Sequence, residues 1–292
     1  MPVKKSCVSY TNSDNVSVKR AIRRGKPIEL YGLTFYPLTM EHFEEWQGLK
    51  AVLLLRMATL PARLAVLPYL AAIYTAETDY YKEHSKTIGL YSAVMRLLEL
   101  ALRLPAREDT PKQRGCIRQE TSKDGEKLLR LHIKQDGNVF TITPQQFGRI
   151  RSLIAAQCGE KLPDEADNPE LVEAEAEANA RGSEDLILDL DDMLASVAVA
   201  TGKSITEMDT MTIWEFNKTH RAVDRAKKFY LYGLAEANGG KIKGGNPCPS
   251  WCFDRQQGMK SLIDANQWQR DVGKGGGVKT VTLDAMPSNL LM

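Results

Sequence analysis

Residues 39–104 read TMEHFEEWQGLKAVLLLRMATLPARLAVLPYLAAIYTAETDYYKEHSKTIGLYSAVMRLLELALRL, and we expect the rest of the chain to be organised around them. Apolar residues recur every three or four positions in three successive segments, which is the period of an α-helix. The first stripe is Phe43, Trp46, Leu49, Leu53, Met57 and Leu60; the second is Leu64, Leu67, Leu70, Ala71 and Tyr74; the third is Ile88, Tyr91, Met95, Leu98 and Leu102. We therefore predict three consecutive helices, with apolar faces wide enough to be buried on more than one side.

Threonine and proline residues set the expected limits of these helices. Thr39 precedes the first stripe, and we expect its hydroxyl to accept a backbone N–H of the first helical turn. Pro61 interrupts the first helix. Pro68 falls inside the second helix, where the loss of one backbone hydrogen bond predicts a kink.

The same stretch raises the question of a membrane span. Its longest run without a charged residue, 64–76, contains 13 residues and is broken by Pro68, whereas a transmembrane helix needs about 20 apolar residues. We therefore interpret the stretch as a soluble helical core without membrane contact. If the chain leaves some of this apolar surface uncovered, a groove for a partner helix follows. The candidate groove residues are Trp46, Leu53, Met57, Leu67 and Tyr74.

Two β elements flank the helices. Alternating apolar residues around Tyr31 and Gly32 predict a short N-terminal hairpin at 27–37. Further along, three short strands are expected at 116–120, 128–134 and 139–142, joined by the Asp-Gly pairs at 124–125 and 136–137. Asp-Gly supplies the positive φ that a tight turn requires, so these segments predict an antiparallel meander.

Capping signals mark the helices that follow the meander. Residues 143–146, TPQQ, combine an N-cap with a capping box, and Gly159 ends that helix. Helices are also expected at 190–201 and 211–238, with a second capping box at Ser204. The predicted fold class is mainly α (α+β): a helical core with a short hairpin and a three-stranded meander, plus a smaller C-terminal helical domain.

Charge is unevenly distributed, although the net charge of the 292 residues is only +2. Residues 1–30 carry seven Lys or Arg against two acids, net +5, whereas residues 160–192 carry thirteen Asp or Glu against two bases, net −11. Blocks of this kind are solvated or bind partners. We predict a disordered basic arm at 1–27, a helical core at 28–159, an acidic linker at 160–188, a C-terminal helical domain at 189–256 and a flexible tail at 257–292.

The sequence carries no signature of catalysis, of a cofactor or of a metal. Five irregularly spaced cysteines and a polar N-terminus without an apolar core predict free thiols in a reducing cytosol. Cys248 and Cys252 lack two further zinc ligands at matching spacing. The GKS at 202–204 lacks the earlier glycine and the preceding strand of a phosphate-binding loop. We therefore predict no enzyme, no cofactor and no metal site.

The helix expected at 211–238 carries a second candidate surface. Lys218, Arg221, Arg225 and Lys228 lie within about 80° on a helical wheel, so they share one face. This face could hold phosphates, an acidic partner or the acidic block of the same chain; alternatively, it is simply solvated, with an intrahelical acid paired to Lys228. The lack of an aromatic platform beside it argues against nucleic-acid binding.

The order of several motifs resembles that of tail assembly chaperones from long-tailed phages and prophages of Gram-positive bacteria. The similar segments are LYGLTFYPLTME at 30–41; ITPQQFGRIR at 142–151, with QCG and KLPD after it; and MTIWEFNK at 211–218, with Tyr230, KIKGG at 241–245 and Trp251 after it. Together they cover roughly residues 28–256, and none is a catalytic signature.

The resemblance implies an assembly factor of the host cytoplasm that coats the hydrophobic tape-measure protein, recruits tail-tube subunits and is left out of the virion. Such proteins often occur in two lengths through a programmed frameshift, and this chain resembles the long form or an unsplit version. The resemblance is also compatible with self-association of the chain. The groove would take a tape-measure helix, and Lys218, Arg221 and Arg225 would form a second, polar docking face. Two other classes remain open: a structural virion component, such as a tail or neck adaptor, and a nucleic-acid-binding regulator.

Overall fold

The computed structural model describes residues 7–12, 14–104, 116–120, 129–165, 189–240, 246, 248 and 250–252. These residues form a mixed structure of helices and strands, which includes two small three-stranded sheets. Contacts divide the chain into two compact units, Met1–Val223 and Asp224–Met292. The division falls inside the last helix rather than in the acidic linker expected at 160–188, of which only 160–165 is described. The tail expected at 257–292 lies outside the described residues.

The first unit begins with a three-stranded sheet. Strand β1 (Val8–Ser9) runs parallel to β2 (Ile28–Leu30), which pairs antiparallel with β3 (Leu33–Phe35). Between β2 and β3, Tyr31 has a φ of 55° and Gly32 a φ of 80°, the left-handed pair that a two-residue type I′ turn requires. The predicted hairpin is confirmed, and β1 is an additional strand that the sequence pattern did not show.

The arm that we predicted to be disordered at 1–27 contains a helix. Helix α1 (Val16–Arg23) begins after Asn15, whose side-chain oxygen accepts the backbone N–H of Ser17 at 2.9 Å. This bond satisfies a donor that the first helical turn leaves unpaired. The helix buries three apolar side chains, those of Val18, Ala21 and Ile22. The prediction is therefore wrong for the described part of the arm, because even a short apolar stripe orders a helix when a core lies beside it.

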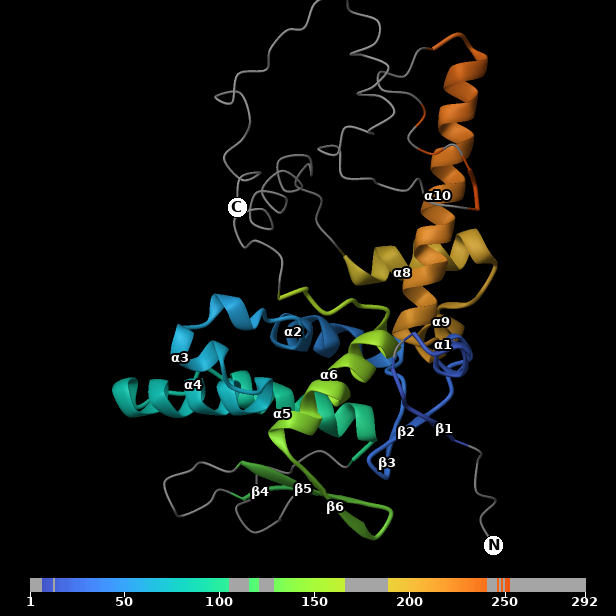
Figure 1. Cartoon of the computed structure of the whole chain (residues 1–292). Coiled ribbons are helices and arrows are strands. Elements are labelled where there is room, and N and C mark those ends of the chain that lie inside the picture. Colours follow the sequence, from blue (N-terminus) through green and yellow to red (C-terminus); the bar gives the residue numbers. More distant parts are fainter. Residues whose placement is uncertain are drawn as a thin grey trace, which may run out of the picture. The chain divides into compact units, whose positions relative to one another are not determined.

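The helices predicted in residues 39–104 are present, but the chain forms more and shorter elements there than predicted. The elements are η1 (Met40–His42), α2 (Phe43–Leu53), η2 (Met57–Thr59), α3 (Ala62–Ala65), α4 (Tyr69–His84) and α5 (Leu90–Leu102) (Figure 1). The first helix thus ends at Leu53 rather than at Leu60. Thr39 makes no side-chain cap and instead pairs with Thr212 in a β-bridge. Pro68 does not kink a helix, because it lies at the N-cap of α4, where no helical hydrogen bond needs its missing N–H.

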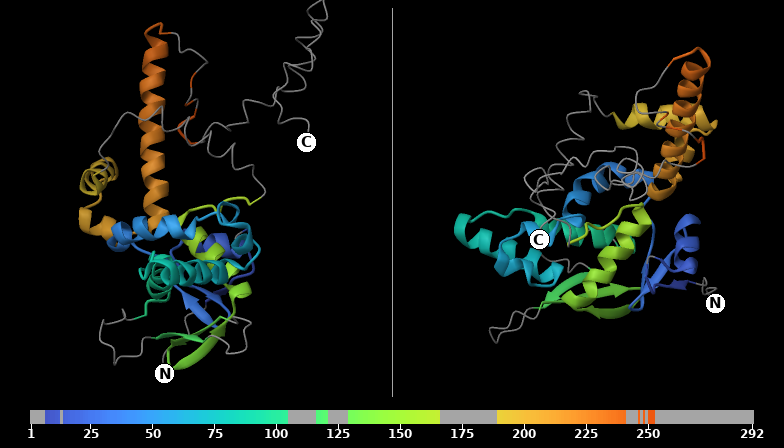
Figure 2. Two further views of the ribbon diagram at one scale, coloured as in Figure 1. Left: turned by 90° about the vertical axis from the view of Figure 1, so that its left-hand side faces the viewer. Right: turned by 45° about the horizontal axis from the view of Figure 1, so that its top comes forward.

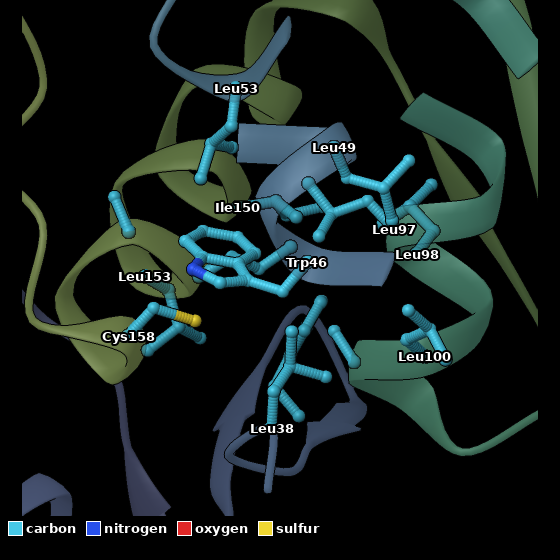
Figure 3. Packing of buried hydrophobic residues seen from close by; sticks show 14 of the residues in the cluster. Leu38, Trp46, Leu49, Leu53, Leu97, Leu98, Leu100, Ile150, Leu153 and Cys158 are labelled. Atoms are coloured by element: carbon cyan, nitrogen blue, oxygen red, sulfur yellow. The ribbon is translucent and has the colours of Figure 1, made fainter. Parts of the chain in front are cut away.

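Trp46 lies at the centre of the hydrophobic core of the first unit. It is 1% exposed, and Figure 3 shows its indole among side chains from α2, from α5 and from α6 (Pro144–Cys158). The residues labelled around it are Leu38, Leu49, Leu53, Leu97, Leu98, Leu100, Ile150, Leu153 and Cys158. Because side chains from three helices surround Trp46, the apolar faces of these helices point at one another. Truncating a buried tryptophan to alanine costs about 3–5 kcal/mol of folding free energy.

The predicted meander is confirmed in the described residues. Strands β4 (Ile117–Glu120), β5 (Arg130–Gln135) and β6 (Asn138–Ile142) pair antiparallel in this order. Asp136 and Gly137 supply the positive φ values of the second turn, 49° and 83°, which a type I′ turn requires. The Asp-Gly pair of the first turn lies outside the described residues.

Helix α6 begins directly after the last strand of the meander, as the right-hand view of Figure 2 shows. Thr143 and Gln146 form the predicted capping box: the hydroxyl of Thr143 accepts the backbone N–H of Gln146, and the side-chain oxygen of Gln146 accepts the backbone N–H of Thr143. Gly159 ends the helix with a φ of 78°, also as predicted.

Within the described residues 189–240, three further helices follow. Helix α8 (Leu190–Thr201) ends at Gly202, whose φ is 71°. A capping box at Ser204 starts α9 (Ile205–Thr210), and α10 (Ile213–Ala237) comes next. The expected positions and capping signals of these helices are confirmed.

The C-terminal helices contribute to the main core as far as Phe216. Apolar side chains of α8, α9 and the start of α10 belong to the same buried cluster as Trp46; they include Leu194, Val197, Met208, Ile213 and Phe216. The structure therefore assigns these helices to the first unit, and not to the separate domain expected at 189–256.

The second unit contains the remainder of α10, residues 224–237, and the described residues of 246–252. Arg225 Nη1 donates to the carbonyl of Cys252 at 2.9 Å, and the thiol of Cys248 donates to the carbonyl of Arg225 at 3.4 Å. These bonds attach the segment around the two cysteines to α10.

We expect Gly32→Ala to lower the free energy of unfolding more than Gly137→Ala does. Both glycines have a positive φ, 80° and 83°, so both changes carry backbone strain of about 1–2 kcal/mol. A Cβ at Gly32 would also lie 2.5 Å from the ring of Phe140, whereas nothing lies within 4 Å of a Cβ at Gly137. Urea unfolding measures both losses, and equal values would contradict the close approach of the first hairpin to β6.

Candidate functional site

The structure buries two of the five residues that we predicted to line an apolar groove. Trp46 and Leu53 are each 1% exposed, so neither can reach a partner, and this part of the prediction is wrong. Helical periodicity identified the apolar face of the first helix correctly. It could not show that side chains from α5 and α6 cover that face (Figure 3).

The other three predicted groove residues are partly exposed, but they lie in different contacts. Met57 in η2 and Leu67 after α3 keep part of their surface in solvent. Tyr74 lies on α4, and its ring packs edge-on against Tyr91 of α5 with 5.3 Å between centroids. Tyr74 therefore belongs to the contact between α4 and α5, and Met57 and Leu67 remain as candidates for partner binding.

Other apolar residues with surface in solvent lie in or next to η2 and α3, two elements that contact each other. We call this set, Met57, Ala58, Leu60, Val66 and Leu67, the η2–α3 surface. Val66 is 82% exposed, whereas Leu64, inside α3, is only 4% exposed. Pro61 and Pro68 prevent the chain from continuing as one regular helix on either side of α3. Leu64 consequently anchors this short segment in the core while its apolar neighbours face outward.

Arg151 of α6 holds the backbone from which the η2–α3 surface projects. Its Nε and Nη2 donate to the carbonyls of Leu53 and Leu55, both at 2.6 Å. A helix leaves its last carbonyls without hydrogen-bond donors, and at the end of α2 Arg151 provides these donors. The guanidinium also lies 4.0 Å from the ring centre of Tyr69, whose hydroxyl donates to the carbonyl of Val52 at 2.5 Å. One cluster thus joins the end of α2, the start of α4 and α6.

Burial shifts the acid–base equilibria of this cluster. Desolvation lowers the pKa of the Arg151 guanidinium and raises the pKa of Tyr69 to about 12, because the charged form of each group loses contact with water. The Tyr69 ring is also stacked on Phe147, with 6.0 Å between centroids and 5° between planes. The cluster therefore acts as a structural anchor for the end of α2, directly before η2.

The predicted basic face of α10 is divided between the two units. Lys218 and Arg221 belong to the first unit and are exposed. The ammonium group of Lys218 lies 5.9 Å from the ring centre of Trp214, which is within the range of a cation–π contact.

Arg225 and Lys228 belong to the second unit, and both have partners there. Arg225 binds the carbonyl of Cys252. Lys228 pairs with Asp224 at 2.9 Å, and this hydrogen bond raises the pKa of Lys228. The intrahelical pair is therefore confirmed, while the use of Lys218, Arg221 and Arg225 as a docking face stays a prediction.

A row of hydrogen-bonded side chains on the meander was not predicted from the sequence. Nδ1 of His132 lies 3.0 Å from Oγ1 of Thr141, and Nε2 lies 2.9 Å from Oε2 of Glu120. Hydroxyl, imidazole and carboxylate follow one another as in a hydrolytic triad. However, the Glu120 side chain is 59% exposed, and activation of a hydroxyl requires a site that excludes water. We interpret the row as cross-strand pairing, which only knowledge of the strand register could have predicted.

A hollow of about 490 Å³ opens beside the second turn of the meander. Its wall includes Tyr36, with the Arg103 guanidinium 4.6 Å from the ring centre, and the buried side chain of Gln135. The Gln135 amide accepts the N–H of Thr34 at 2.8 Å and donates to the carbonyls of Thr34 and Leu102 at 2.9 and 3.1 Å. Because both the oxygen and the nitrogen of this buried amide already have hydrogen-bond partners, we assign no ligand to the hollow.

The cysteines and histidines add no metal centre in the described part of the chain. All five cysteines are free there, and no group of three or more His, Cys, Asp or Glu side chains is placed to hold an ion. Among the helices of the same residues, none is long and apolar enough to cross a membrane.

Comparisons of the chain with protein-family models, with curated proteins and with solved structures find no match. A functional assignment therefore depends on the motifs and on the geometry of the chain itself.

We expect Arg151→Met to lower the free energy of unfolding by about 3 kcal/mol, because it leaves the carbonyls of Leu53 and Leu55 without donors. The control is Arg149→Met on the same helix, where the guanidinium is exposed and donates to the carbonyl of Thr11 at 2.6 Å. We expect the control to lose less than about 1 kcal/mol. Urea unfolding compares the two variants, and equal losses would show that Arg151 is not an anchor.

We also expect stability to depend on the protonation of Tyr69. Its pKa in the folded chain, about 12, lies above the ordinary value of 10.0, so the associated stability is complete below pH 10 and is lost as the pH rises toward 12. Relative to Tyr69→Phe, the wild type should lose about 2 kcal/mol between pH 9 and pH 11.5. Urea unfolding across this range measures the difference, and a constant difference would refute the burial of the hydroxyl.

Proposed function

We propose that the chain is a tail assembly chaperone of a long-tailed phage or prophage. It is a non-enzymatic factor of the host cytoplasm that binds the tape-measure protein, helps to recruit tail-tube subunits and is absent from the mature virion. Three segments resemble the corresponding motifs of this family: LYGLTFYPLTME at 30–41, ITPQQFGRIR at 142–151 and MTIWEFNK at 211–218.

The contacts among these motifs support the proposal. Backbone hydrogen bonds join the first motif to the third, from Met40 N–H to the carbonyl of Met211 and from Ile213 N–H to the carbonyl of Leu38, each at 2.9 Å. The second motif opens α6, whose apolar side chains belong to the same buried cluster. Segments that are far apart in the sequence therefore form one scaffold.

The η2–α3 surface is the observation that carries the proposal. Val66 is 82% exposed, and Met57, Leu60 and Leu67 of the same stretch are partly exposed. Arg151 holds the backbone that precedes this stretch. Exposed apolar patches of this kind mark sites of polypeptide binding. An amphipathic helix binds such a surface through apolar residues spaced at one turn, and the resemblance makes the tape-measure protein the source of that helix.

The energetics of this binding mode suit a chaperone. Removal of apolar surface from water contributes about 25 cal/mol per Å², and ordering the partner opposes this gain. A small surface such as this one therefore binds each helical turn weakly and reversibly. A factor that must leave before the tail is complete needs this property.

Co-expression with the tape-measure protein tests the proposal. We expect the wild type to increase the soluble fraction of the tape-measure protein and to co-purify with it. Leu60→Ser combined with Val66→Ser should reduce co-purification about tenfold, because two apolar contacts are worth about 1.4 kcal/mol or more. The control combines Val139→Ser with Val199→Ser, two apolar side chains that are 65% and 87% exposed elsewhere in the first unit, and it should bind as the wild type does.

Three outcomes would contradict the proposal. Failure of the wild type to solubilise or co-purify the tape-measure protein would refute the function. Equal losses in both double variants would refute the assignment to the η2–α3 surface. Mass spectrometry of purified particles adds a further check, because stoichiometric amounts of the chain in the virion would identify a structural component such as a tail or neck adaptor.

A further inference from the structure

Residues 160–165, EKLPDE, form a strap that is attached at both ends to the segment running from α2 to η2. At its start, Glu160 Oε1 pairs with Lys50 Nζ of α2 at 2.6 Å. Near its end, the carbonyl of Asp164 accepts Nη2 of Arg56 at 2.8 Å. Figure 1 shows this segment after α6, passing along α2.

The last residue of the strap binds the η2–α3 surface itself. The two carboxylate oxygens of Glu165 accept the backbone N–H groups of Met57 and Ala58 at 3.1 and 3.2 Å. Between the two ends, Leu162 packs against the hydrophobic core, as do the partly buried Leu55 and Met57. The strap therefore combines polar attachments at its ends with an apolar contact in its middle.

We infer that the strap is a releasable cover: closed, it shields apolar side chains between α2 and η2, and open, it adds them to the η2–α3 surface for a polypeptide ligand. This inference rests on the proposed function for the identity of that ligand. The shielding itself is a property of the chain alone and can be measured without a partner.

The contacts of the strap explain why it can open without unfolding the core. In the described residues, the last backbone-to-backbone hydrogen bond donated by this segment runs from Glu160 N–H to the carbonyl of Ala155, at 2.9 Å. Beyond it, the strap is held by the packing of Leu162 and by polar contacts of Glu160, Asp164 and Glu165. Both Asp164 and Glu165 are exposed. The Glu160–Lys50 pair, whose side chains are 20% and 33% exposed, still reaches solvent and weakens with salt. The buried contacts of α6 are unaffected by their loss.

Met57 couples the strap to the binding surface. Its backbone N–H binds Glu165, and its side chain belongs to the η2–α3 surface. A ligand that repositions Met57 therefore weakens the attachment of Glu165, and a strap that is closed opposes the ligand. This coupling is reciprocal, as linkage requires.

The test compares Glu160→Gln/Glu165→Gln with a control, Glu44→Gln/Glu83→Gln, which neutralises two exposed glutamates elsewhere in the first unit. The probe of apolar surface is the dye 1-anilinonaphthalene-8-sulfonate. We expect the strap variant to bind several times more dye than the wild type. Its Met57 and Ala58 amides should exchange with deuterium about tenfold faster, because they lose a charged acceptor, while amides in α5 and α6 keep their protection. The control should match the wild type in both measurements.

The outcomes separate the strap from the proposed function. Unchanged dye binding or unchanged exchange at Met57 and Ala58 would overturn the inference, and faster exchange throughout the core would show a brace needed for folding instead of a cover. Increased dye binding with no co-purification of the tape-measure protein by any variant supports the cover and refutes the chaperone. Co-purification that is equal in the wild type and in the strap variant supports the chaperone and refutes control by the strap.

Discussion

The placement of the helices depends on how the end of α2 is satisfied. A helix that stops inside a protein leaves carbonyl groups that require donors, and here the guanidinium of Arg151, beneath the ring of Tyr69, supplies two of them. A buried charge is tolerated only when it is well hydrogen-bonded, so this cluster favours one arrangement of α2, α4 and α6. The chain that follows α2 must then turn outward, and it forms the short elements η2 and α3.

That outward turn explains why apolar residues remain in contact with water in a chain that has a substantial core. Trp46 and Leu53 complete the packing among α2, α5 and α6, and Leu64 holds α3 in place. Two prolines limit how much of the intervening segment can turn inward. The result is an apolar surface on a firmly held frame, beside a strap attached through Glu160 and Glu165. An exposed apolar surface has a cost in solubility, and a removable cover reduces it.

Much of the local structure could be predicted from the sequence, because local rules govern it. The turn at Tyr31 and Gly32 and the capping boxes at 143–146 and Ser204 depend on residues within a few positions of one another. The candidate site could be predicted only in part. The burial of Trp46 and the end of α2 are decided by α5 and by Arg151, about 50 and 100 residues further along. Periodicity identifies an apolar face, but it does not identify what covers that face.

The proposed function requires that the η2–α3 surface receives another polypeptide. The most direct measurement places a photo-crosslinking amino acid at position 66, which is 82% exposed, and in a second variant at position 139, which is 65% exposed, in cells that assemble tails. After irradiation, the account predicts that adducts with the tape-measure protein form at position 66 and not at position 139. Adducts in equal yield at both positions, or none at position 66, would contradict it.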